Sequence, residues 1–175
     1  MEPYLYPDEQ SIFLDFIKGI PETGKIVEWG SGGSTVKIVD TITDKQSVIS
    51  IEHDKEWYDK IFNELTLKNK SNWTLLHRTE NNIYRHNIGT PDDENPVGYD
   101  EYIFPDESVL DGNFFFIDGV ARSSIALMLL ARAKNRDAVV LIHDANHRGV
   151  FYSWAARLFP KTEMLGTSLL RLHLS

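Results

Sequence analysis

The chain has 175 residues, 42% of them hydrophobic, which suits one globular domain with a sizeable core. Its formal net charge of −8 is unevenly spread: residues 86–121 hold nine acids and no Lys or Arg, whereas residues 122–175 hold three acids and eight bases. Cysteine is absent, which excludes disulfides, thiolate metal sites and cysteine nucleophiles. The sequence has no apolar run of about 18 residues and no signal-peptide pattern at its start, so we expect a cytoplasmic protein without a membrane partner.

Apolar residues recur along most of the chain with alternating helical and strand spacing. A first helix is predicted to begin at Pro7 and Asp8 and to end near Gly19. Helices are then predicted to start at Ser34 and Asp54, which are suitable N-caps, and further helices follow Gly119 and cover 150–159. Strands are predicted at 25–29, 47–51, 73–77, 114–117 and 138–142, with two short strands in 162–175.

The stretch from about 81 to 112 shows no clear period and holds most of the acidic surplus. An unstructured connection of this length is uncommon inside a compact domain and is often functional. Disorder is one interpretation, and an ordered lid is the other, because Tyr99, Tyr102 and Phe104 give the stretch something to pack with. We predict a single domain over 1–175 with an acidic flap at about 81–112.

The strand–helix alternation predicts a doubly wound, Rossmann-like α/β fold with a mostly parallel sheet and helices on both faces. The strands at 114–117 and 138–142 are apolar throughout, as expected of strands covered on both faces. Ligands bind such sheets outside the carboxyl ends of the strands. The segments that directly follow strands are therefore the candidate site: 28–35, 52–54, 77–80, 118–122 and 143–148.

The loop after the first strand, Gly30–Thr35, is rich in glycine, which lets backbone amides approach a ligand closely. Thr35 stands where a dinucleotide motif has its third glycine, and the Lys of a phosphate-binding loop is absent. Glu28 would repel a pyrophosphate but suits a cation such as the amino group of S-adenosylmethionine (SAM). Glu52, at the end of the second strand, can accept the ribose hydroxyls of either SAM or NAD.

Three segments resemble the class I SAM-dependent methyltransferases: Glu28–Thr35 their first motif, Ile51–Asp54 the acidic end of their second strand, and Phe116–Gly119 their fourth-strand motif. The resemblance implies a seven-stranded sheet whose last strand, here Leu169–Leu174, is antiparallel and inserts next to the fifth. It also implies SAM as cofactor. The implied cofactor-binding residues are Glu28, Gly30, Ser31, Gly32, Gly33, Ser34, Thr35, Glu52 and His53.

Candidates for the chemistry follow the fourth and fifth strands. Methyl transfer needs nucleophile and methyl in line and, for a hydroxyl nucleophile, removal of a proton. Asp118, His143 and Asp144 are the predicted catalytic residues, and His143 has an ordinary pKa suited to a base near neutral pH. Asp118 could instead cap a helix, and His143 could be a hydrogen-bonded structural residue. The predicted substrate-binding residues are Arg122, Arg148 and Tyr152.

The oxygen-bearing side chains of Asp118, Asp144 and Asn146 would suit Mg²⁺ or Ca²⁺ better than zinc. The set resembles the metal triad of catechol-type O-methyltransferases, in which an Asp-Asn pair ends the fifth strand. In this chain Ala145 separates Asp144 from Asn146, so a bound divalent cation requires that the three side chains still converge.

The segment Val140–Arg148, together with Asp118 and Arg122, resembles the plant glucuronoxylan O-methyltransferases. This resemblance implies a sugar hydroxyl as the acceptor, including that of a uronic acid, whose carboxylate Arg122 and Arg148 would bind. The basic character of residues 122–175 fits an anionic acceptor and fits an ordinary solvated surface equally well.

The sequence thus predicts a SAM-dependent methyltransferase acting on an oxygen of a small molecule or saccharide. A non-enzymatic SAM- or nucleotide-binding module, or an assembly subunit, remains an alternative. A nucleic-acid methyltransferase is disfavoured by the net charge, and Asp118–Ala121 replaces the Asn/Asp-Pro-Pro-Tyr/Phe signature of amino-methylating members. An NAD oxidoreductase is least favoured, because Thr35 replaces the third glycine and the chain is too short for a second catalytic domain.

Overall fold

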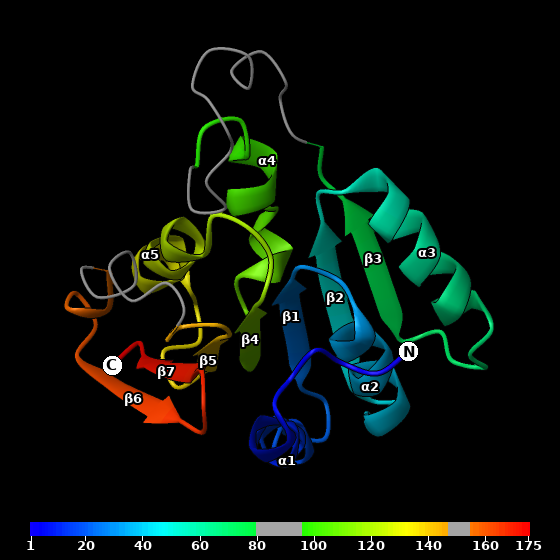
Figure 1. Cartoon of the computed structure of the whole chain (residues 1–175), viewed down its shortest axis with the longest axis horizontal. Coiled ribbons are helices and arrows are strands. Elements are labelled where there is room, and N and C mark those ends of the chain that lie inside the picture. The colour runs from blue at the N-terminus through cyan, green and yellow to red at the C-terminus, as the bar shows by residue number, and fades with distance from the viewer. Residues whose placement is uncertain (80–95, 147–154) are drawn as a thin grey trace.

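A computed structural model describes residues 1–79, 96–146 and 155–175, and these residues form a seven-stranded sheet with helices on both faces (Figure 1). The strands are β1 (Lys25–Trp29), β2 (Ser47–Glu52), β3 (Trp73–His77), β4 (Phe114–Ile117), β5 (Val139–Ile142), β6 (Lys161–Leu165) and β7 (Leu169–His173). The helices are α1 (Pro7–Lys18), α2 (Gly33–Thr41), α3 (Lys55–Thr66), α4 (Asp100–Ile103) and α5 (Arg122–Arg132), with a 3₁₀ helix, η2 (Glu107–Val109). Within the described ranges, no helix is long and apolar enough to cross a membrane.

The strand order is β3-β2-β1-β4-β5-β7-β6, and β1 to β5 pair in parallel. β7 lies between β5 and β6 and is antiparallel to both. This arrangement confirms the predicted doubly wound fold and the inserted antiparallel last strand. The order reverses direction between β1 and β4, which places the ends of β1, β2 and β4 around the crevice where sheets of this kind bind ligands.

Alternate residues of each central strand pack on opposite faces of the sheet. Phe114 and Phe116 contact the core beneath α1, α2 and α3, whereas Phe115 and Ile117 contact the core that includes α4 and α5. All four side chains are fully buried. Double coverage by helices therefore explains why this strand is apolar at every position rather than at every second one.

The helix after β1 begins differently from the prediction. Ser34 is not its N-cap: α2 starts at Gly33, with Gly32 in the cap position. The Ser34 hydroxyl instead donates to the buried Glu28 carboxylate at 2.5 Å, because that acceptor lies directly beneath the first helical turn. The predicted cap at Asp54 is confirmed, since its carboxylate accepts the Trp57 amide at 2.7 Å.

The described second half of the acidic stretch, residues 96–112, packs into the core. Tyr99, Tyr102 and Ile103 are buried there, and the carbonyl of Tyr102 accepts the indole N–H of Trp29 at 2.8 Å. Because Trp29 ends β1, this bond joins α4 to the centre of the sheet. Residues 81–95 of the predicted flap lie outside the described residues, so a flap over the site stays a prediction.

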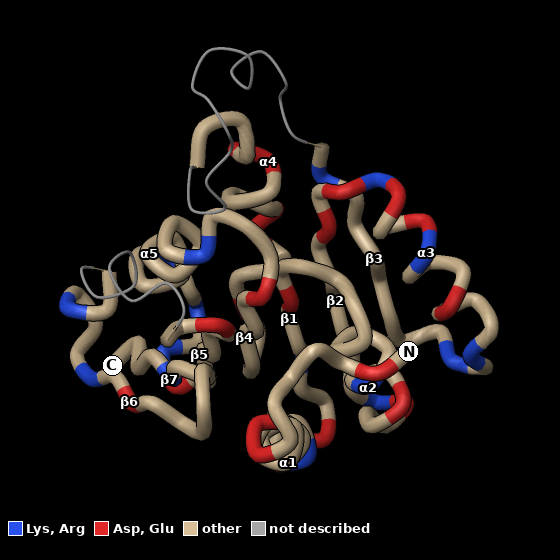
Figure 2. The backbone as a smooth tube through the Cα atoms, in the orientation of Figure 1, with Lys and Arg blue, Asp and Glu red and all other residues tan. Residues whose placement is uncertain are grey.

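The acidic stretch meets the basic third of the chain at Glu107, which pairs with Arg132 at 2.6 Å and with Lys134 at 3.2 Å. Figure 2 shows the basic positions of α5 at its ends. Arg132 is the last residue of α5 and Arg122 the first, so the two lie roughly 15 Å apart along the helix axis. The charge pairing therefore fastens η2 to the far end of α5, away from the residues that follow β4.

Candidate functional site

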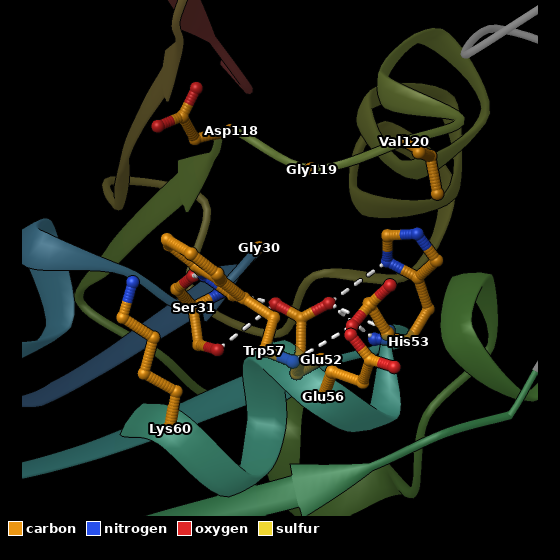
Figure 3. A pocket seen from close by; sticks show the side chains of 11 residues that line it. Gly30, Ser31, Glu52, His53, Glu56, Trp57, Lys60, Asp118, Gly119 and Val120 are labelled. Atoms are coloured by element: carbon orange, nitrogen blue, oxygen red, sulfur yellow. Dashed lines mark hydrogen bonds and ion pairs between the residues drawn. The ribbon is translucent and has the colours of Figure 1, made fainter. Parts of the chain in front are cut away.

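A cavity of about 690 Å³ lies at the carboxyl ends of β1, β2 and β4 (Figure 3). Its walls come from the glycine loop, the end of β2, the first turns of α3 and the turn after β4. In Figure 3, Asp118 and Gly119 lie across the cavity from Trp57 and Lys60 of α3. The lining residues are Gly30, Ser31, Glu52, His53, Asp54, Glu56, Trp57, Lys60, Asp118, Gly119 and Val120.

The glycine loop approaches the turn after β4 with no room for a side chain at Gly30. A Cβ there would lie 2.5 Å from the backbone nitrogen of Gly119, and the φ of +90° is one that residues with side chains rarely adopt. Gly32 differs, since it is in the extended region and an added Cβ would meet no atom closer than 3.8 Å. Backbone contact between the two loops thus requires glycine at position 30 and not at position 32.

Glu28 lies beneath the loop and does not line the cavity. Its side chain is fully buried and accepts hydrogen bonds from the hydroxyls of Ser34 and Thr35, both at 2.5 Å, and of Ser50 at 2.7 Å. Burial raises its pKa from 4.5 to about 7, although the three hydroxyls act in the opposite direction. These hydrogen bonds hold the glycine loop onto β1 and β2. Glu28 thus stabilises the loop from below, whereas the sequence predicted that it would contact the amino group of the cofactor directly.

The raised pKa of Glu28 predicts a pH-dependent stability. The folded protein keeps a proton on Glu28 that the unfolded chain releases above pH 4.5, so this stabilisation is complete below pH 4.5 and is lost as the pH rises through 7. Each pKa unit corresponds to about 1.4 kcal/mol. Between pH 4 and pH 8, the free energy of unfolding of the wild-type protein should therefore fall by about 3 kcal/mol more than that of Glu28→Gln, which has no charge to bury. Urea unfolding of both proteins at pH 4 and pH 8 measures this, and an equal difference at the two pH values would contradict it.

Glu52 is the carboxylate of the cavity floor. One oxygen accepts the amide and hydroxyl of Ser31, at 2.8 and 2.9 Å, and the other accepts the amides of His53 and Asp54, both at 2.8 Å. The side chain is 2% exposed yet borders the cavity. These bonds fix the carboxylate at the end of β2 and join it to the glycine loop, so the sequence-predicted Glu52, His53, Gly30 and Ser31 do converge.

Sequence reasoning missed three residues around this cavity. Trp57 donates its indole N–H to the Ser31 carbonyl, and the Lys60 ammonium lies 4.2 Å from the centre of its ring. Tyr102 is fully buried, and a Cβ at Gly119 would lie 2.0 Å from its hydroxyl oxygen. Trp57 and Lys60 fall within the helix predicted to start at Asp54, and Tyr102 belongs to the stretch without a period, so none of the three carried a local signal for the site.

A second cavity of about 650 Å³ adjoins the first, and Asp118 and Trp57 line both. One wall is the N-terminal segment Pro3–Pro7, which passes over α2 so closely that a Cβ at Gly33 would lie 2.2 Å from the carbonyl oxygen of Glu2. The other wall holds Arg122, His143 and Asp144. The predicted catalytic residues Asp118, His143 and Asp144 are thus brought together at this cavity.

His143 is enclosed by carboxylates. Its Nδ1 lies 2.8 Å from Asp118 Oδ1 and 3.7 Å from Asp144 Oδ1, and its Nε2 lies 3.3 Å from Glu9 Oε2. Burial acts to lower the pKa of His143, but the hydrogen bond and charge of Asp118, followed by Asp144 and Glu9, raise it above 6.5 overall. Carboxylates therefore face both ring nitrogens, and the shortest of these contacts joins the ring to Asp118.

Arg122 holds the turn after β4 together. Its guanidinium donates to the carbonyls of Gly119 at 2.6 Å, His143 at 2.6 Å and Asp118 at 3.0 Å, and also to the Asp144 carboxylate at 3.3 Å. The residue is 5% exposed. This geometry differs from the predicted substrate clamp, because the donors that a substrate carboxylate would need already bind the protein itself.

The predicted oxygen triad does not converge on a metal ion. Asn146 donates its amide to the Thr167 carbonyl at 2.7 Å, in the turn before β7, whereas the ligand atoms of Asp118, His143 and Asp144 lie within 4.8 Å of one another. The guanidinium of Arg122 lies 3.6 Å from Asp118 and 3.3 Å from Asp144 and already supplies positive charge between them. These residues do not fit a divalent cation. The predicted Arg148 and Tyr152 lie outside the described residues.

No protein-family model and no curated protein matches the sequence. Among solved structures, the chain is similar to a methyltransferase-like protein from Silicibacter pomeroyi, at 20% identity and TM-score 0.74 over 98% of this chain and 88% of that one. It is also similar to a SAM-dependent O-methyltransferase from Thermotoga maritima, at 11% identity and TM-score 0.62, over 98% of this chain and 65% of that one. A third similar structure is that of precorrin-6y C5,15-methyltransferase from Geobacter metallireducens, at 13% identity and TM-score 0.59, over 98% of this chain and 90% of that one.

These likenesses show that the chain has the fold of the SAM-dependent methyltransferases, over nearly its whole length. The fold agrees with the family resemblance of the three motifs. Because the similar structures range from an O-methyltransferase to a precorrin methyltransferase, the shared fold does not identify the acceptor.

Proposed function

We propose that the protein is a SAM-dependent methyltransferase that methylates an oxygen of a small molecule or saccharide. The observation that carries the proposal is the shared wall between the two cavities. Asp118 and Trp57 line both, so a cofactor in the first cavity and an acceptor in the second would meet beside these two side chains. Bringing two reactants into line in this way is the main task of an enzyme whose cofactor already carries the activated group.

The first cavity fits the cofactor by the chemistry of its walls. Glu52 offers a fixed carboxylate for ribose hydroxyls, and the backbone around Gly30 and Gly119 can approach the amino-acid end without side chains in the way. His53 and Trp57 give the cavity ring surfaces next to that carboxylate. When bound, SAM supplies a methyl group on a sulfonium. Glu28 supports this site from below by holding Ser34, Thr35 and Ser50 in place.

Asp118 supplies the polar group on the acceptor side. His143 donates to Oδ1, and the carboxylate is 22% exposed, so it can accept the hydrogen of an acceptor hydroxyl and orient its oxygen. His143 then holds the carboxylate rather than acting as the first base. An oxygen nucleophile is favoured because Asp118–Ala121 reads Asp-Gly-Val-Ala, without the signature of amino-methylating members.

The second cavity supports a small acceptor. Its volume of about 650 Å³ falls within the roughly 300–1,000 Å³ range of small-molecule sites. Tyr4, Tyr6 and Trp57 offer ring surfaces, and Asp118 and Asp144 offer acceptors for hydroxyl groups. This combination suits a hydroxyl-bearing ring such as a phenol or a sugar. Among the described residues that line this cavity, Arg122 is the arginine, and its guanidinium already donates to backbone carbonyls. The proposed acceptor therefore does not need a carboxylate for Arg122 to bind.

Isothermal titration calorimetry with SAM and with S-adenosylhomocysteine tests the cofactor half of this proposal. Both are expected to bind one site per chain, and ATP and NAD serve as matched controls that share only the adenosine portion. Folded protein that binds neither sulfur compound, or that binds NAD more tightly, would overturn the proposal. Binding without methyl transfer to any phenol or methyl glycoside would favour the non-enzymatic SAM-binding module.

A further inference from the structure

Glu9 is a buried carboxylate that the proposed reaction has not used. It lies in the first turn of α1, and its side chain is fully buried. One oxygen, Oε1, accepts the amide of Ser168 and also its hydroxyl at 2.9 Å, while Oε2 accepts the amide of Tyr6 at 3.1 Å. Glu9 thus joins the N-terminal segment, the turn before β7 and α1. Burying a carboxylate is unfavourable unless its partners compensate, so this placement calls for a reason beyond capping a helix.

That reason lies on the remaining side of Oε2, which faces Nε2 of His143 at 3.3 Å. The opposite ring nitrogen faces Oδ1 of Asp118 at 2.8 Å. The three side chains come from α1, the end of β5 and the end of β4, and they form a line from the core to the shared wall of the two cavities. Asp144 and Arg122 are the other charged groups at this ring.

We propose that Glu9 is a positioning residue, which fixes the ring of His143 and through it the carboxylate of Asp118 at the wall between the two cavities. The proposal rests on the function proposed above. Carboxylate oxygens face both ring nitrogens, with Glu9 Oε2 3.3 Å from Nε2 and Asp118 Oδ1 2.8 Å from Nδ1, so their charges favour a ring that is protonated on both nitrogens. A flipped ring would lose the hydrogen bond to Asp118. A carboxylate behind a functional histidine commonly fixes the orientation of its ring. A ring fixed in this way keeps its other carboxylate partner, here Asp118, in one rotamer.

The ¹⁵N NMR spectrum of the His143 ring in the wild-type protein tests the contact directly and needs neither an acceptor nor a variant. The proposal requires Nε2 to be protonated, and an Nε2 shift typical of a bare lone pair would overturn it. In Glu9→Gln the Nε2 resonance is expected to move. This readout is independent of SAM, so failure of the proposed function, seen as absent SAM binding, remains distinguishable from failure of the Glu9 proposal.

Turnover gives the second readout, with radiolabelled SAM and a panel of phenols and methyl glycosides as acceptor probes. Glu9→Gln should lower kcat by about 10–100-fold, the range for removing a supporting partner of a functional histidine, with the KM for SAM within about twofold. Ser168→Ala is the matched control: it removes one hydrogen bond to Oε1, leaves Oε2 facing His143, and should keep kcat near wild type. An equal loss in both variants would assign Glu9 a merely structural role and overturn the proposal. If no probe is methylated, the nitrogen spectrum decides alone.

Discussion

Asp118→Asn is expected to lower turnover by about 10²–10⁴-fold, the usual contribution of a positioned proton acceptor, while SAM affinity changes by no more than a few-fold. The asparagine keeps Oδ1 as the acceptor for His143 Nδ1 but replaces the second carboxylate oxygen with an amide donor. An acceptor hydroxyl would then meet a donor instead of an acceptor. Single-turnover rates with radiolabelled SAM, together with titration of S-adenosylhomocysteine, separate chemistry from binding.

Glu56→Gln is the matched control for this prediction. Glu56 also lines the first cavity, so the substitution removes the same charge, but it does not line the second cavity. Its turnover should stay close to that of the wild-type protein. Equal losses in the two variants would indicate a general effect of charge in the first cavity and would contradict the role given to Asp118.

Gly30→Ala is expected to weaken SAM binding by about 10–100-fold. The backbone strain at a φ of +90° is roughly 1–3 kcal/mol, and the added Cβ would lie 2.5 Å from the Gly119 nitrogen, so the loop and the turn after β4 must separate. That separation would change the wall of the first cavity on both sides. Titration with SAM, after circular dichroism has shown a folded protein, measures the effect.

Gly32→Ala provides the comparison within the same loop. Its backbone is extended and its added Cβ would meet nothing closer than 3.8 Å, so SAM affinity should stay within a few-fold of wild type. Equal affinities for the two alanine variants would show that contact between Gly30 and Gly119 does not shape the binding site.

The sheet could be predicted from the sequence because each of its parallel strands is a local apolar run. β1, β3 and β4 have the predicted bounds, and β2 extends one residue further to Glu52. The antiparallel insertion of β7 was confirmed, but it came from the family resemblance rather than from periodicity. Burial on both faces of the sheet leaves a strong sequence pattern, and the carboxyl-end rule then located the cavity.

Contacts between distant segments left no such pattern. Glu9 reads as a surface residue in the first turn of a helix, yet it bonds with Ser168, 159 positions away. Residues 3–6 precede the first predicted element and still form part of a cavity wall. The direction of a side chain could not be predicted from its position near a strand end either. Glu28 points beneath the glycine loop, and Asn146 points to the turn before β7.

The roles assigned to charged residues were least predictable. Arg122 follows a strand and has the chemistry of a carboxylate clamp, but it binds three backbone carbonyls of the turns around it. Its burial depends on how the turns after β4 and β5 come together, which no local spacing encodes. The same guanidinium lies between Asp118 and Asp144 and so decides against the divalent cation that those two carboxylates suggested.

A crystal structure of the protein with S-adenosylhomocysteine tests the central claim most directly. We expect the ribose hydroxyls on Glu52, the amino-acid portion against the backbone of Gly30 and Gly119, and the sulfur directed past Asp118 toward the second cavity. A ligand bound elsewhere, or bound with its sulfur directed away from Asp118, would overturn the proposed cofactor site.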